Sequence, residues 1–144
     1  MSSVYLTILT ESGERLGDKY ETLGAGWELF NNKLIIDGYD LRPYIFCPEG
    51  YMSEEEYLSM NLDEPKEVTE RTLELYRHIS KDEFFPIQKV LAEITAASSL
   101  ANNYKESDFL DDNKEEFIAE LNELKEEIHS NLKQGLNIQL FCAD

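Results

Sequence analysis

Two histidines, one pair of serines and several runs of carboxylates are the side chains of this sequence whose types could carry out chemistry. His78 lies near the end of a predicted helix, where the helix dipole favours a protonated imidazole, and His129 follows Glu126 by three residues on another. Ser98 and Ser99 lack the elbow glycine and the neighbouring base that activate a nucleophilic serine. We therefore predict that the protein is not an enzyme and has no catalytic residues.

The carboxylate runs 54–56 and 111–112 have the composition of a general acid–base pair, or of ligands for a hard cation such as Ca²⁺. Catalytic carboxylates usually lie in apolar clefts that separate their pKa values, whereas both runs stand at predicted helix starts, where acids favour the dipole. No segment follows the D-x-[DN]-x-[DN]-G spacing of a calcium loop. The sequence predicts no metal site and no cofactor, and a carboxylate-based, metal-assisted enzyme is kept as an alternative hypothesis.

Acidic residues are concentrated in two segments, which carry most of the net charge of −17. Residues 49–74 hold nine acids against Lys66 and Arg71, and residues 106–127 hold ten against Lys114 and Lys125. Like charges gathered in this way destabilise a compact fold by repulsion, so two such patches indicate a role with a basic partner. The alternative interpretation is a solvated surface that keeps the protein soluble.

The same charge pattern argues against several other partners. Phosphate binding requires clustered lysines and arginines, but the 13 basic residues are scattered and outnumbered by acids, so neither nucleic acid nor an anionic membrane is an expected partner. The N-terminus has no basic region followed by an apolar run, and no apolar stretch approaches the ~18 residues of a membrane span. We expect a cytoplasmic protein whose two cysteines, Cys47 and Cys142, are reduced.

The first third of the chain has the residue pattern of β-strands. Apolar residues alternate over residues 4–9, and residues 27–30 and 33–36 flank Asn31-Asn32, which tolerates the backbone of a tight hairpin turn. Residues 44–47 form a further short apolar run. This part of the sequence predicts a meander of three or four strands.

Helical periodicity begins after residue 53 and continues to about residue 132. Alternation returns at residues 136–142, which predict a strand that joins the N-terminal sheet. The sequence therefore predicts one α+β domain, residues 1–144, with an antiparallel sheet packed against about four helices. The predicted starts and stops are a capping box at Ser53 and Glu56, a first turn at Pro65, another at Pro86, an N-cap at Asp112 and a left-handed stop at Gly135.

Two groups of residues are candidates for binding a partner. The outward face of the last predicted helix is nearly all anionic, and three consecutive glutamates in the first acidic segment stand between two tyrosines, a residue type enriched at the centres of interfaces. The alternative is that Tyr57 is a core contact of a short helix. The candidate contacts are Tyr51, Glu54, Glu55, Glu56 and Tyr57 in the first group, and Asp111, Asp112, Glu115, Glu116 and Glu123 in the second.

In size, acidity and its cluster of tyrosines and acids, the chain resembles bacterial immunity proteins, which block a cognate toxin. It also resembles phage-encoded nucleic-acid mimics that inhibit restriction or CRISPR effectors. These resemblances imply a non-catalytic inhibitor that occludes a basic toxin domain, most plausibly a nuclease, or alternatively a nucleic-acid-binding effector. The other hypothesis is a regulatory adaptor that binds through a sheet edge formed by the strand Leu136–Cys142.

Overall fold

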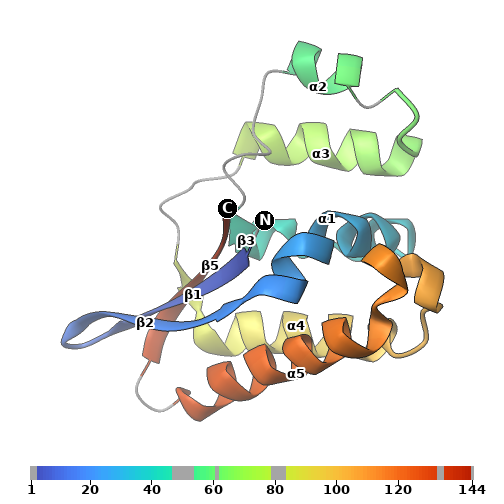
Figure 1. Ribbon diagram of the computed structural model, residues 1–144. Coiled ribbons are helices and arrows are strands. Elements are labelled where there is room, and N and C mark those ends of the chain that lie inside the picture. Colours follow the sequence, from blue (N-terminus) through green and yellow to red (C-terminus); the bar gives the residue numbers. More distant parts are fainter. Residues whose placement is uncertain (1–2, 47–53, 61, 79–83, 133–134, 144) are drawn as a thin grey trace.

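A computed structural model describes residues 3–46, 54–60, 62–78, 84–132 and 135–143 (Figure 1). The fold is α+β, as the sequence predicts, with five α-helices and a five-stranded sheet among these residues. In chain order the elements are β1 (Ser3–Thr10), β2 (Gly13–Tyr20), α1 (Glu21–Ile36), η1 (Arg42–Tyr44), β3 (Ile45–Phe46), α2 (Glu54–Met60), α3 (Lys66–His78), β4 (Phe85–Pro86), α4 (Ile87–Ala101), η3 (Glu106–Asp108), η4 (Leu110–Asp112), α5 (Lys114–Ser130) and β5 (Gly135–Ala143).

The C-terminal strand β5 lies inside the sheet. The strand order is β2-β1-β5-β3, and β4 pairs with β5 on the same side as β3. β1 pairs with β5 along nearly its whole length, antiparallel, while the short β3 pairs with β5 in parallel. The predicted return of the C-terminus to the N-terminal sheet is confirmed, but the adaptor hypothesis needed β5 at an open edge. That part is wrong, because β5 has neighbours on both sides.

A helix, α1, replaces the hairpin predicted over residues 27–36. Leu23, Trp27, Phe30 and Leu34 recur at helical spacing, and all four are buried, so the helical period prevails over the local turn signal of two asparagines. Asn31 is buried within the helix and donates from Nδ2 to the Trp27 carbonyl at 3.3 Å. A short apolar run flanked by turn residues is compatible with a strand or a helix. Here the burial of one helical face in the tertiary structure favours the helix.

Four helices follow residue 53, as predicted, but the last of them does not begin and end at the predicted residues. Asp112 does not cap α5, because the residue before the helix is Asn113 and Asp112 has a left-handed φ of 54°. Gly135 does not stop α5 either. The helix ends at Ser130, and Gly135 is the first residue of β5. The predicted capping residue Ser53 lies outside the described residues.

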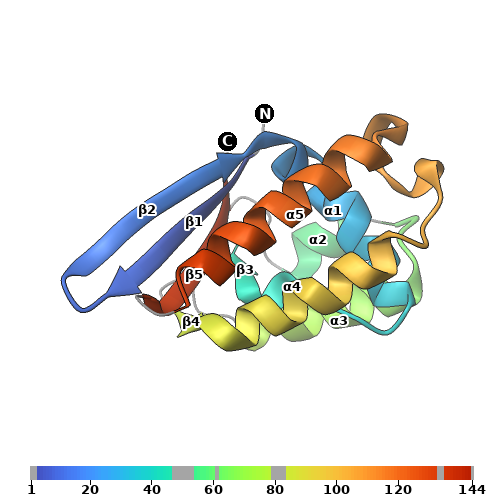
Figure 2. The same cartoon turned by 90° about the horizontal axis from the view of Figure 1, so that it is seen from below.

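The core lies between the sheet and helices α1, α4 and α5 (Figures 1 and 2). α1 contacts β1, α4 contacts β5 and α5 contacts β2. The buried side of the sheet is formed by Val4, Leu6, Ile8, Ile138 and Leu140. An aromatic cluster joins the helices at the other end of the core, and it consists of Trp27, Phe30, Tyr104, Phe109 and Phe117.

Candidate functional site

The outward side of α5 and the adjoining η4 turn present the second group of predicted contacts. Asp111, Asp112, Glu115, Glu116 and Glu123 are all exposed, as the helical pattern predicts. Within the described part of the chain, none of the five forms an ion pair. The side therefore keeps its full negative charge, which is what attraction of a basic partner requires.

Two other glutamates of α5 serve the fold. Glu120 accepts hydrogen bonds from the Thr22 amide at 3.0 Å and the Leu23 amide at 3.2 Å. These amides belong to the first turn of α1, whose N-cap residue Tyr20 makes no side-chain cap bond. Glu120 thus caps α1 from a different helix, and its negative charge also favours the helix dipole.

Glu127 fastens α5 to the edge strand β2. Its carboxylate accepts from the Asp18 amide at 2.8 Å and from the Tyr20 hydroxyl at 2.5 Å. Burial, together with this carboxylate, raises the pKa of Tyr20 far above its usual value, so the phenol stays protonated and donates. Gly17 makes room for the carboxylate, because a Cβ at this position would collide with the Glu127 Oε1 atom.

The sequence contains a signal that separates these two glutamates from the exposed ones. With a 100° step per residue, Glu120 and Glu127 lie nearer the buried stripe of α5 than Glu123 or Glu126 does. A carboxylate beside an apolar stripe is close enough to reach a neighbouring element. The acidic side of α5 is therefore divided between structural carboxylates and free surface charge.

Four of the first group of predicted contacts, residues 54–57, lie on α2, and the structure divides them. Glu54, Glu55 and Glu56 are exposed, whereas Tyr57 is only 5% exposed. The prediction of Tyr57 as a surface anchor is wrong, and the alternative that it is an inward contact of a short helix is confirmed. Tyr51 lies outside the described residues.

The two acidic segments lie on opposite sides of the molecule. α2 and α3 lie above α1 in Figure 1, and α4 and α5 lie below it, while Figure 2 shows α5 in front and α2 and α3 behind. α1 contacts both α3 and α5 and separates them. The protein thus has two acidic surfaces, one on each side of α1.

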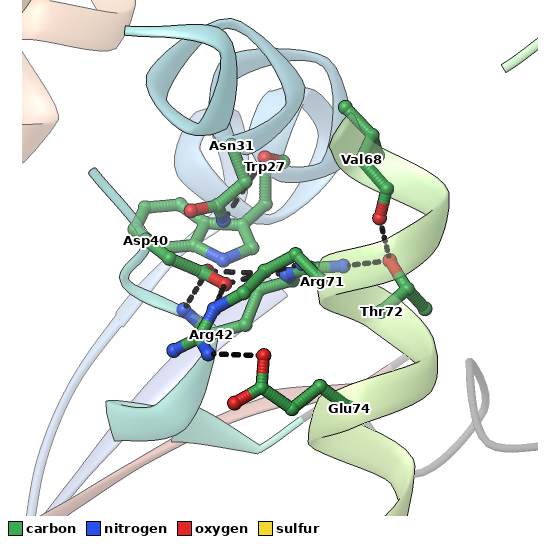
Figure 3. Close-up of polar contacts among 8 residues, drawn as sticks. All are labelled: Trp27, Asn31, Asp40, Arg42, Val68, Arg71, Thr72 and Glu74. Carbon is green, nitrogen blue, oxygen red and sulfur yellow. Dashed lines mark hydrogen bonds and ion pairs between the residues drawn. The ribbon is translucent and has the colours of Figure 1, made fainter. Parts of the chain in front are cut away.

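A polar network attaches α3 to the connection that follows α1 (Figure 3). Asp40, whose side chain is 8% exposed, accepts from Arg42 Nε at 3.1 Å and from Arg71 Nε at 3.0 Å. Arg42 also donates to the Thr72 hydroxyl, which donates to the Val68 carbonyl at 2.8 Å. The nearly buried carboxylate of Asp40 therefore joins Arg42, in the connection after α1, to Arg71 of α3.

Beside this network are two buried polar atoms, Trp27 Nε1 and Asn31 Oδ1, that have no hydrogen-bond partner in the described structure. An unsatisfied buried polar atom costs about 1–3 kcal/mol. The network holds α3 against α1, where Val68 and Thr72 are buried. The ion pair of Arg71 with Asp40 and the hydrogen bond of Arg42 to Thr72 thus add polar contacts to the apolar burial of Val68.

Neither a metal-binding cluster nor an activated serine is found among the described residues. No three His, Cys, Asp or Glu side chains among them converge to hold a metal ion. Ser98 is buried against Asn122, and Ser99 donates to the Thr95 carbonyl at 3.2 Å. Neither serine contacts a base, so this part of the chain gives no support for a nucleophilic serine.

Comparison with known proteins gives no relative from which a function can be transferred. No protein-family model matches the chain, and no curated protein or solved structure is significantly similar to it. No described helix is long and apolar enough to cross a membrane. The functional argument therefore rests on the charges, exposure and contacts of this chain.

Proposed function

We propose that the protein is a non-catalytic, acidic inhibitor of the immunity type, which binds and occludes the basic domain of a nuclease toxin in the cytoplasm. The observation that carries the proposal is the exposed and unneutralised carboxylates on the outward side of α5 and η4. Carboxylates of this kind attract the basic surface with which a nucleic-acid-binding partner normally receives phosphates.

The second acidic surface supports the same proposal. Residues 54–74 contain eight acidic side chains and only two basic ones, and the two basic ones are engaged, Lys66 with Glu70 at 3.7 Å and Arg71 with Asp40. Charge on both sides of a small domain raises the rate of encounter with a basic partner from every direction. One side then makes the contact and the other contributes only to the long-range field.

The mechanism requires no bond to be made or broken. Attraction between the acidic inhibitor and the basic groove speeds association, and the bound inhibitor blocks the groove by its bulk and charge. Such attraction is screened by salt, since the Debye length falls from about 10 Å at 0.1 M to about 3 Å at 1 M. Strong salt dependence of the association rate is the expected signature.

The test is a pull-down with the tagged protein from lysate of the source organism at low salt and at ~0.5 M salt, followed by an activity assay. We expect one basic protein to be retained at low salt and weakened at high salt, and its own activity to be blocked by the purified inhibitor. A partner that is retained equally at both salt concentrations, or whose activity persists at saturation, would overturn the proposal.

A further inference from the structure

Exposed leucines mark the first acidic segment. Leu58 on α2 is 44% exposed, and Leu62 in the turn after α2 is 83% exposed. They are four positions apart in the sequence, and Glu54, Glu55 and Glu56 precede Leu58 by two to four positions on α2. An apolar centre with a charged rim is the usual composition of a protein–protein contact surface.

The contribution of α2 to the fold does not account for these leucines. Among its described side chains, residues 54–59, only Tyr57 is buried. α2 is the outermost element on its side of the molecule and lies beyond α3 in Figure 1. A partner would therefore add apolar burial at Leu58 on α2 and at Leu62 in the turn that follows it.

Charge selects the kind of partner that this surface accepts. A second copy of the chain would bring one acidic α2 against another, and an anionic membrane would repel it in the same way. A basic protein surface with an apolar pocket complements both the leucines and the glutamates. The α5 side, by comparison, has one large exposed hydrophobic residue near its described acidic side chains. This residue is Leu110 of η4, which is 42% exposed.

We infer that the contact surface for the basic partner is centred on Leu58 and Leu62, with Glu54, Glu55 and Glu56 as its rim, and that the α5 side acts only through long-range attraction. This inference rests on the proposed function and deepens it, because it assigns the contact to one of two acidic surfaces. It also replaces Tyr57 with Leu58 and Leu62 as the anchoring side chains.

The experiment uses two synthetic helical peptides as probes, one with leucines along one side and lysines along the other, and a second in which every leucine is serine. Their affinities are measured by fluorescence anisotropy for the wild-type protein, for the double variant Leu58→Ser, Leu62→Ser, and for Leu16→Ser. Leu16 is a matched control, since it is 80% exposed but lies on β2. All these leucines are exposed, so the variants retain the fold, which the fluorescence of the buried Trp27 verifies.

We expect the leucine-containing peptide to bind the double variant about tenfold or more weakly than the wild type, because two leucines that the bound peptide would partly cover are gone. Its affinity should be unaffected by Leu16→Ser. The lysine–serine peptide should bind all three proteins equally and weakly. Equal binding of the leucine-containing peptide to the double variant and the wild type would overturn the inference and leave the proposed function standing. Failure of both peptides to bind even at low salt would contradict the proposed function itself.

Discussion

Replacing Gly17 by alanine tests whether Glu127 fastens α5 to the edge of the sheet. A Cβ at residue 17 would collide with the Glu127 Oε1 atom and lie 3.1 Å from Leu6 Cδ2. The glutamate side chain is flexible and would swing away. In doing so it would lose its hydrogen bonds to the Asp18 amide and the Tyr20 hydroxyl. Glycine is required here by the space that the carboxylate occupies.

The cost follows from those two hydrogen bonds. A hydrogen bond to a charged group contributes about 1.5–3 kcal/mol, and the bond to the Asp18 amide is exposed and belongs at the low end. Alanine recovers about 0.5 kcal/mol because it restricts the unfolded chain more than glycine does. The expected net loss is about 2.5–4 kcal/mol in the free energy of unfolding, or roughly 8–13 °C in Tm for a chain of this length.

The assay is urea unfolding followed by the fluorescence of Trp27, the single tryptophan of the chain, which is buried in the core. The control is the same substitution in a Glu127→Ala background, where the colliding carboxylate is gone. There Gly17→Ala should be close to neutral, so the two substitutions should be coupled by about 2.5–4 kcal/mol. An equal loss of stability in both backgrounds would refute the role assigned to Glu127.

Two further predictions distinguish groups that the sequence alone treats alike. Glu120→Ala should lower the free energy of unfolding by about 0.5–2 kcal/mol because α1 loses its cap, whereas Glu123→Ala on the exposed side should change it by less than about 0.5 kcal/mol; urea unfolding of both variants checks this, and equal effects would contradict the capping role. Burial raises the pKa of Glu64 above its usual 4.5, so ionisation of this side chain destabilises the native state. The destabilisation is absent below the usual pKa, and it develops as the pH rises from there through the raised pKa. Glu64→Gln should therefore raise Tm at pH 7 and leave it unchanged near pH 3, and a Tm gain of equal size at both values would rule out this cause.

Helix positions with strong periodicity were predictable from the sequence. Phe117, Leu121, Leu124 and Ile128 form the buried stripe of α5 at helical spacing, because side chains three and four residues apart share one side of a helix regardless of what packs there. The return of the C-terminal strand to the sheet was predictable for a similar reason. Alternating apolar residues need a strand partner, and the N-terminal strand was available.

The helix α1 was missed because its sequence satisfies two local patterns. Asn31 and Asn32 have the types of a hairpin turn, yet Asn31 is buried within the helix. Burial of Trp27 and Phe30 against the aromatic ring of Phe117 outweighs the turn preference of the asparagines. That contact joins residues about 90 positions apart, so no local window contains it.

By itself, the sequence determined the α+β class, the periodic helix faces and the concentration of acids in two segments, since each of these depends on composition or on local spacing. Only the tertiary structure decided how those acids are used. It placed the two segments on opposite sides of α1, turned Tyr57 inward while leaving Leu58 and Leu62 exposed, and engaged Glu120 and Glu127 in holding other elements. The physical reason is that a carboxylate becomes structural or free according to which amide or hydroxyl lies within hydrogen-bond distance, and the fold alone brings such groups together.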